Sequence, residues 1–295
     1  MSDTIDQSAV STAAKRHSSS RRHPFLVWLA VVWLGVMIVA GIGADILSPH
    51  DYRDLDLRNR LLPPLFFGGQ LSHPLGTDQL GHDVFSRLLH SIRMSFLVAL
   101  IGTVIGAALG TILGFIAAHR RGIADDVITM FVDFQAAMPF TIIALTVLAF
   151  FGNDLMLFIA VMGIYGWERY ARLARGLALS ARKQGYALAL DTLGAGPWRI
   201  YSRHILPNIG SVLIVNMTIN FPETILAESA LSFLGLGIQP PLTSLGNMLG
   251  YGRDYLTTAW WIVVFPGLTI VFSVLAMSLL GDWLRDRLDP RISAN

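Results

Sequence analysis

The feature that most constrains this chain is its set of long apolar segments. Five stretches are long enough, at 1.5 Å of rise per residue, to cross a hydrocarbon core of ~30 Å as helices. They are residues 25–47, 94–118, 127–151, 209–234 and 259–281. Only 14% of the 295 residues are charged, whereas a soluble domain has about 25%. We therefore predict an all-α membrane protein, because spanning helices satisfy their own backbone hydrogen bonds.

A sixth span is predicted at residues 155–167, although its apolar length is short. It runs on into an arginine-rich helix that we expect to rise into the cytosol. With six spans, sixteen Lys and Arg lie on one side of the membrane and six on the other. This asymmetry obeys the positive-inside rule and places both termini in the cytosol. Without the sixth span, the basic segment 168–208 would fall on the outer side.

Four glycines recur at every fourth position of the segment 94–118. They are Gly102, Gly106, Gly110 and Gly114. Such a face lets a neighbouring helix approach closely, so we predict helix packing there. A role in a moving interface is the alternative.

Polar residues interrupt the apolar segment 209–234. Asn216, Asn220 and Glu223 lie within it, and Pro222 predicts a kink near its middle. Ionisable groups at membrane depth usually face a cavity or a partner. One interpretation is that these three side chains line a polar translocation path. The other is hydrogen bonding between helices without any ligand contact.

The segment 182–208 is polar and basic and lies between two apolar regions. Gly194 and Pro197 predict a break between one helix over 181–193 and a second over 198–205. The first helix carries an apolar stripe of the kind that docks into a groove on another protein. The stripe consists of Tyr186, Ala189, Leu190 and Leu193. A helix lying on the lipid headgroups is the alternative.

Several chemistries are excluded by the residues that the chain lacks. It has no cysteine, and neither of its two lysines, Lys15 and Lys183, follows the glycine-rich loop of an ATP site. His73, His82 and His204 are isolated in the sequence, so we expect no metal or other cofactor. The chain is therefore predicted to be non-catalytic, and energy for any transport has to come from another protein.

The segment 182–208 resembles the coupling loop of bacterial binding-protein-dependent ABC importer permeases. That loop reads Glu-Ala-Ala, three residues, Gly and, later, Leu-Pro. Leu188-Ala189-Leu190 stands in the place of the triplet, Gly194 in that of the glycine, and Leu206-Pro207 in that of the close. Four other segments resemble the peptide and nickel branch of that family, in particular its C-type subunit. They are residues 73–95, 226–241, 246–267 and 281–291.

The resemblance implies a type I ABC importer permease in the bacterial inner membrane, made of a tail, an entry region and a core. Residues 1–23 would be a disordered cytosolic tail, and 24–93 the first spanning helix with a periplasmic loop. The permease core would be 94–291, followed by the tail 292–295. The implied partners are a B-type permease subunit, two ATP-binding subunits, a periplasmic substrate-binding protein and the lipid bilayer, with no nucleic acid.

The resemblance also implies a mechanism and a set of contacts. The ATPase subunits would push the coupling helices, and the permeases would move peptides or related small solutes by alternating access. Contacts with the ATPase would come from the segment 182–208, through Tyr186, Ala189, Leu190, Asp191, Gly194, Leu206 and Pro207. Leu188 replaces the usual glutamate, so either Asp191 supplies the charged contact or the docking is apolar.

One alternative function is an ion-coupled secondary transporter that would use Asp133, Glu223 and Glu228. It would transport without an ATPase, but the chain lacks the internal repeat that such transporters often show. A membrane-embedded enzyme is disfavoured, because no reactive constellation is visible. The sequence does not distinguish among dipeptides, oligopeptides, glutathione, nickel chelates and opines as the substrate.

Overall fold

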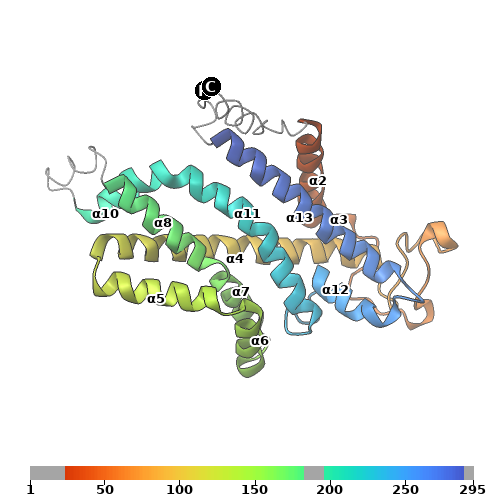
Figure 1. Ribbon diagram of the computed structural model, residues 1–295. Coiled ribbons are helices and arrows are strands. Elements are labelled where there is room, and N and C mark those ends of the chain that lie inside the picture. The colour runs from red at the N-terminus through yellow and green to blue at the C-terminus, as the bar shows by residue number, and fades with distance from the viewer. Residues whose placement is uncertain (1–23, 183–195, 289–295) are drawn as a thin grey trace, which may run out of the picture.

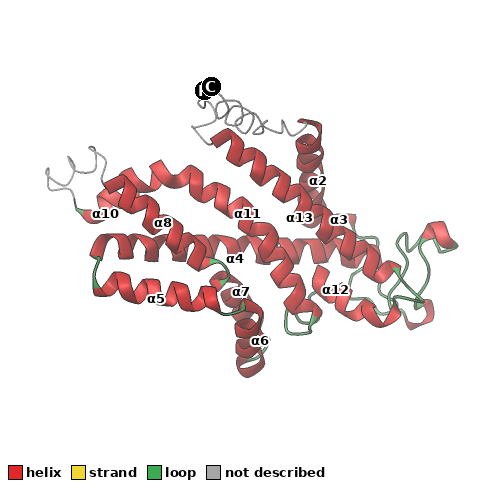
Figure 2. Ribbon diagram, in the orientation of Figure 1, coloured by secondary structure: helices red, strands yellow, loops and turns green. Residues whose placement is uncertain are grey.

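The structure, a computed structural model, describes residues 24–182 and 196–288. In this part of the chain the regular elements are helices, joined by turns and loops (Figure 2). The main elements are α2 (Pro24–Ile42), α3 (Ala44–Leu47), α4 (Val84–Arg120), α5 (Ile123–Ala137), α6 (Phe140–Phe151), α7 (Leu155–Ile164), α8 (Trp167–Arg182), α10 (Pro197–Ile200), α11 (Leu206–Phe233), α12 (Leu245–Gly252) and α13 (Trp261–Leu288). Short 3₁₀ turns cover Leu57–Asn59, Leu65–Phe67 and Arg253–Tyr255.

The helix α4 is the centre of the molecule and contacts α2, α5, α7, α8 and α11 (Figure 1). It begins at Val84, ten residues before the predicted start, because the Asp83 carboxylate caps it by accepting from the Ser86 amide at 2.8 Å. It then runs for 37 residues. The extra turns at its start carry the chain from the outer loop into the predicted span.

Four helices are long and apolar enough to cross a membrane, namely α2, α4, α11 with the turns before it, and α13. They correspond to four of the predicted spans. The fifth prediction, 127–151, is divided into α5 and α6, which meet at 93° and count as one span only if the bent pair is taken together. Proline disfavours the α conformation of the residue before it, and Met138 before Pro139 is extended.

The sixth predicted span was wrong in one respect, because it does not continue directly into the arginine-rich helix. The helix α7 has only ten residues and ends at Ile164. Gly166 then adopts a φ of +78°, a conformation that favours glycine, and α8 starts anew at Trp167. By length and composition, the described residues therefore contain four candidate spans, or up to five.

The glycine face of α4 lies against the α7–α8 region. A Cβ atom added at Gly102 would lie 3.0 Å from the carbonyl oxygen of Met162. One added at Gly110 would meet the Trp167 carbonyl oxygen and would lie 2.7 Å from the Cβ atom of Tyr170. The two segments thus pack backbone against backbone, as closely as glycine permits.

The helix α11 is unbroken from Leu206 to Phe233 and contains Pro222. It is preceded directly by α10 and a π-helical turn, Tyr201–Ile205. The predicted second helix of the segment 182–208 is therefore not separate, because Pro207 lies in the first turn of α11. Proline cannot donate a backbone hydrogen bond to the preceding turn, and the change to a π-helical turn lies just before Pro207.

Candidate functional site

The helix α8 has two faces of opposite character. Small and aromatic residues on one face are buried against α4, namely Trp167, Tyr170, Ala171, Ala174, Ala178 and Ala181. Its exposed stripe is polar or small and consists of Arg169, Arg172, Gly176 and Ser180. The exposed face of α4, by contrast, is apolar and includes Leu97, Leu100, Val104 and Ile112. Only the second kind of face suits contact with lipid.

Three arginines of α8, three residues apart, form ion pairs with acids from two other helices. Arg169 pairs with Glu223 of α11, Arg172 with Asp133 of α5 at 3.4 Å, and Arg175 with Asp125 of α5 at 2.6 Å. We call these three pairs the arginine ladder and each pair a rung. The ladder joins α8 to both α5 and α11.

The arginine ladder extends from the middle of the helices towards one end. Beside Glu223, the Thr224 hydroxyl lies 3.3 Å from that of Thr103, which is inside the predicted span 94–118. At the other end, Asp125 lies in the first turn of α5, just after α4 ends. A charge at the bilayer centre costs about 2.5–3.5 kcal/mol on insertion scales. The ladder therefore belongs against water or protein rather than lipid.

The three predicted path residues differ in their burial and in their hydrogen-bond or ion-pair partners. The Asn216 amide donates to the Val212 carbonyl in its own helix at 3.0 Å and is half-buried. Asn220 is buried, and its amide lies against Gly166 at the α7–α8 break. Glu223, which is the charged member of the three, forms an ion pair with Arg169. All three point from the same side of α11, but Asn220 lies inside the chain.

The three arginines of the ladder were not among the predicted site residues. Their spacing at 169, 172 and 175 was the available signal, because residues three apart share one face of a helix. Glu228, the other acid noted in this span, is fully buried and accepts hydrogen bonds from Ser229 and Ser232 at 3.3 and 2.7 Å. It lies apart from the ladder.

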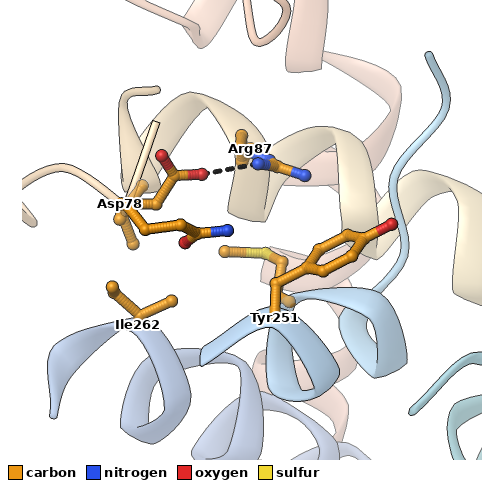
Figure 3. A pocket seen from close by; sticks show the side chains of 7 residues that line it. Asp78, Arg87, Tyr251 and Ile262 are labelled. Atoms are coloured by element: carbon orange, nitrogen blue, oxygen red, sulfur yellow. Dashed lines mark hydrogen bonds and ion pairs between the residues drawn. The ribbon is translucent and has the colours of Figure 1, made fainter. Parts of the chain in front are cut away.

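A second polar cluster organises the outer loop between α3 and α4. The Asp78 carboxylate accepts from the Leu80 amide at 2.8 Å, from His82 and from Arg87 at 2.5 Å. Figure 3 shows the Arg87 pair beside a small cavity of about 10 Å³, which Tyr251 and Ile262 also line. Burial raises the pKa of Asp78, but His82 and Arg87 outweigh it and hold this pKa below its ordinary value.

His73 and His82, which are isolated in the sequence, each have a carboxylate partner in the folded outer loop. His82 Nδ1 lies 2.8 Å from Asp78, and His73 Nδ1 lies 3.1 Å from Asp83. His50, His73 and Asp83 form the one candidate metal-binding group in the part of the chain that the structure describes, with ligand atoms within 4.8 Å. The His50 and His73 rings stack at 4.6 Å and 25°, so their in-plane lone pairs do not converge on one point. These contacts are explained by the packing of the loop.

We expect Asp78→Asn to destabilise the outer loop by about 3 kcal/mol near pH 7, because it leaves Arg87 without its buried partner. A carboxyl with a lowered pKa stabilises the fold above its unfolded pKa of about 3.9, and this contribution is lost as pH falls through the folded value. The difference between wild type and variant in thermal unfolding is therefore expected to shrink below about pH 4. The control is Asp54→Asn, at an exposed position of the same loop. Equal unfolding midpoints of the two variants at pH 7 would contradict this account.

The predicted coupling residues are divided between described and undescribed parts of the chain. Tyr186, Ala189, Leu190, Asp191 and Gly194 lie outside the described residues. Leu206 and Pro207 begin α11 and are exposed, and Trp198 of α10 is 82% exposed. The described part of the predicted coupling segment thus exposes an apolar surface.

A large apolar groove of about 1010 Å³ lies between α2, α4, α11 and α13. Its lining includes Gly35, Phe96, Leu100 and Met217. It contrasts with the polar surface of the ladder. A groove with this lining suits a hydrocarbon chain or another apolar helix.

Residues 110–294 match the family described as "Binding-protein-dependent transport system inner membrane component". The di/tripeptide transport system permease protein of Pseudomonas aeruginosa (strain UCBPP-PA14) is 37% identical over 263 residues, which cover 89% of this chain and 87% of the relative. The dipeptide transport system permease protein of Bacillus subtilis (strain 168) is 35% identical, over 89% of this chain and 80% of the relative. The probable D,D-dipeptide transport system permease protein of Escherichia coli (strain K12) is 35% identical, over 91% and 88%.

The chain belongs to the family of inner-membrane components of binding-protein-dependent transport systems. It is a multi-pass membrane protein of the bacterial inner membrane and a permease subunit of a binding-protein-dependent ABC importer. The resemblance deduced from the residues is thereby confirmed.

Proposed function

We propose that this chain and a B-type permease form the membrane pathway of an importer for peptides or related small solutes. Two ATP-binding subunits would power it, and a periplasmic binding protein would deliver the solute. The observation that carries the proposal is the 35–37% identity, over most of both chains, to three proteins named as peptide transport permeases. The chain itself would change no covalent bond.

The topology proposed is six crossings with both termini in the cytosol. The crossings would be α2, α4, the bent pair α5–α6, the broken pair α7–α8, α11 and α13. The loop charges support this order. The arrangement in Figure 1 also supports it, because the start of α2 and the end of α13 lie along the same upper edge of the molecule. The outer loops 48–93 and 235–258 would then face the binding protein.

The coupling surface proposed is the segment 182–208, which includes the exposed start of α11. Tyr186, Ala189 and Gly194 would enter a groove on the ATPase, and Trp198 would extend that contact. The support is the apolar surface that Trp198 and Leu206 expose within this segment. Apolar contacts with the ATPase would compensate for the charged contact that is lost because Leu188 replaces the usual glutamate.

The translocation path proposed follows the polar surface where α8 meets α11. Asn216 and Glu223 would line it together with Arg169 and Arg172 of the ladder, while Asn220 packs behind them. The second permease would form the opposite wall. The support is the exposure of charged side chains at a depth where the lipid-facing sides of other helices are apolar.

A labelling experiment tests this path. Because the chain has no cysteine, single cysteines can be placed without removing others. We expect Asn216→Cys, in the assembled importer, to react with a charged, membrane-impermeant thiol reagent. Val104→Cys, next to Thr103 on the apolar face of α4, is expected to stay unreactive. Reaction at Val104→Cys but not at Asn216→Cys would overturn the proposed path.

The secondary-transporter alternative gains no support from the relatives.

A further inference from the structure

We propose that the first two rungs of the arginine ladder, Arg169–Glu223 and Arg172–Asp133, form a weak binding site for zwitterionic solutes such as short peptides. An arginine would take the solute's carboxylate, for which its planar fork is suited. The carboxylate of Glu223 or Asp133 would take the solute's ammonium group. This inference rests on the proposed path, which brings the solute to these side chains.

The three rungs differ in how firmly they are closed. In the third rung, both Asp125 oxygens accept from Arg175, each at 2.6 Å, and the aspartate side chain is only 16% exposed. In the second rung, a single contact of 3.4 Å joins Arg172 and Asp133, whose side chains are 60% and 66% exposed. The first rung is also a single contact, with exposures of 51% for Arg169 and 37% for Glu223. The third rung therefore fastens α8 to α5, and the other two are open to a ligand.

The weakness of the open rungs permits exchange with a ligand. An exposed ion pair is worth about 0–1 kcal/mol, so separating it costs little. A zwitterion offers a new partner to both members of a separated pair. A solute with only one charge satisfies one member and leaves the other unpaired. The site therefore favours zwitterions, and its low affinity suits a path from which the solute has to depart.

The spacing of the rungs fits a short peptide. Arg169 and Arg172 are three residues apart on α8, which is a rise of about 4.5 Å. A fully extended dipeptide spans at most about 7 Å. A dipeptide lying along α8 is therefore longer than the rise between the two rungs, so we expect its two termini to contact neighbouring rungs.

Protection of a single cysteine from labelling tests this site. Gly176 lies one turn beyond Arg172 on the exposed stripe, and a Cβ atom there would meet open space. Gly176→Cys therefore reports on the site while every charge of the ladder is kept. Thr257→Cys is the control, because this position is also exposed but lies in the outer loop, away from the ladder. Both variants would be labelled with a maleimide in the assembled importer, in lipid nanodiscs without the binding protein.

The probes are alanyl-alanine, its N-acetyl derivative and its C-terminal amide. At about 10 mM, a dissociation constant near 1 mM predicts about ten-fold slower labelling of Gly176→Cys by alanyl-alanine. We expect neither blocked peptide to slow it, and no probe to affect Thr257→Cys. Adding Arg169→Gln or Asp133→Asn to the Gly176→Cys variant is expected to abolish protection without changing the labelling rate in the absence of probe.

Three results would overturn the site: no protection, equal protection by the blocked peptides, or protection that survives Arg169→Gln. Measuring the uptake of alanyl-alanine by the complete wild-type importer distinguishes a failure of the proposed binding site from a failure of the proposed function. Uptake without protection would refute the site and leave peptide import standing. Protection without uptake of any peptide would support the site and refute peptide import.

Discussion

Replacing Gly110 by leucine is expected to prevent correct assembly of the helix bundle. A Cβ atom there would lie 2.7 Å from the Tyr170 Cβ and 2.9 Å from the Ala171 amide nitrogen, besides meeting the Trp167 carbonyl oxygen. Two of these three atoms belong to the α8 backbone, so a rotamer change cannot relieve the clash. Overpacking of a well-packed site costs about 1–3 kcal/mol and more where backbone has to move. We expect a large fall in the yield of monodisperse complex and in its unfolding temperature.

The matched control for Gly110→Leu is Gly35→Leu in α2. Both positions are glycines in spanning helices, but nothing lies within 4 Å of a Cβ at Gly35. This variant is expected to assemble like wild type. Equal yield and unfolding temperature of the two variants would contradict the close packing of α4 on α8.

Replacing Gly194 by leucine is expected to uncouple ATP hydrolysis from transport. In the sequence, Gly194 stands where the family's coupling loop has its glycine, and we expect leucine there to displace the helix that is predicted over residues 181–193. We expect uptake to fall about ten-fold or more, equivalent to at least 1.4 kcal/mol, while ATPase activity and the amount of assembled complex are kept.

Gly210→Leu is the control for that experiment, since it adds the same side chain near the same end of the molecule. Nothing lies within 4 Å of a Cβ at Gly210. We expect its uptake to stay within about two-fold of wild type, as for a surface substitution that costs less than 0.5 kcal/mol. Unchanged uptake in Gly194→Leu would exclude the coupling role.

The membrane class and the four longest helices could be predicted from hydropathy, because a spanning helix needs a continuous apolar stretch. The breaks were harder to predict. Pro139 is visible in the sequence, yet the 93° angle between α5 and α6 depends on packing. Gly166 was an even weaker indication of a helix break, because glycine is tolerated inside helices. Its positive φ, which separates α7 from α8, is seen only in the structure.

The site could be predicted only in part, because its pairs join distant segments. Glu223 and Asp133 were recognised as acids in apolar surroundings, but their arginines lie 54 and 39 residues away. Which residues face each other across two helices depends on how the helices are placed relative to each other. Hydropathy does not specify that placement. The contacts of the outer loop could not be predicted for the same reason, because His73 and Asp83 come together only when the loop has folded.

The central claim is that this chain is a permease powered by partner ATPases. The most direct test is uptake of labelled alanyl-alanine into proteoliposomes that contain the complete importer, with ATP inside and loaded binding protein outside. We predict uptake that requires ATP, the binding protein and both permeases, and that a proton or sodium gradient does not replace. Uptake by this chain alone, driven by an ion gradient without ATPase subunits, would contradict the account.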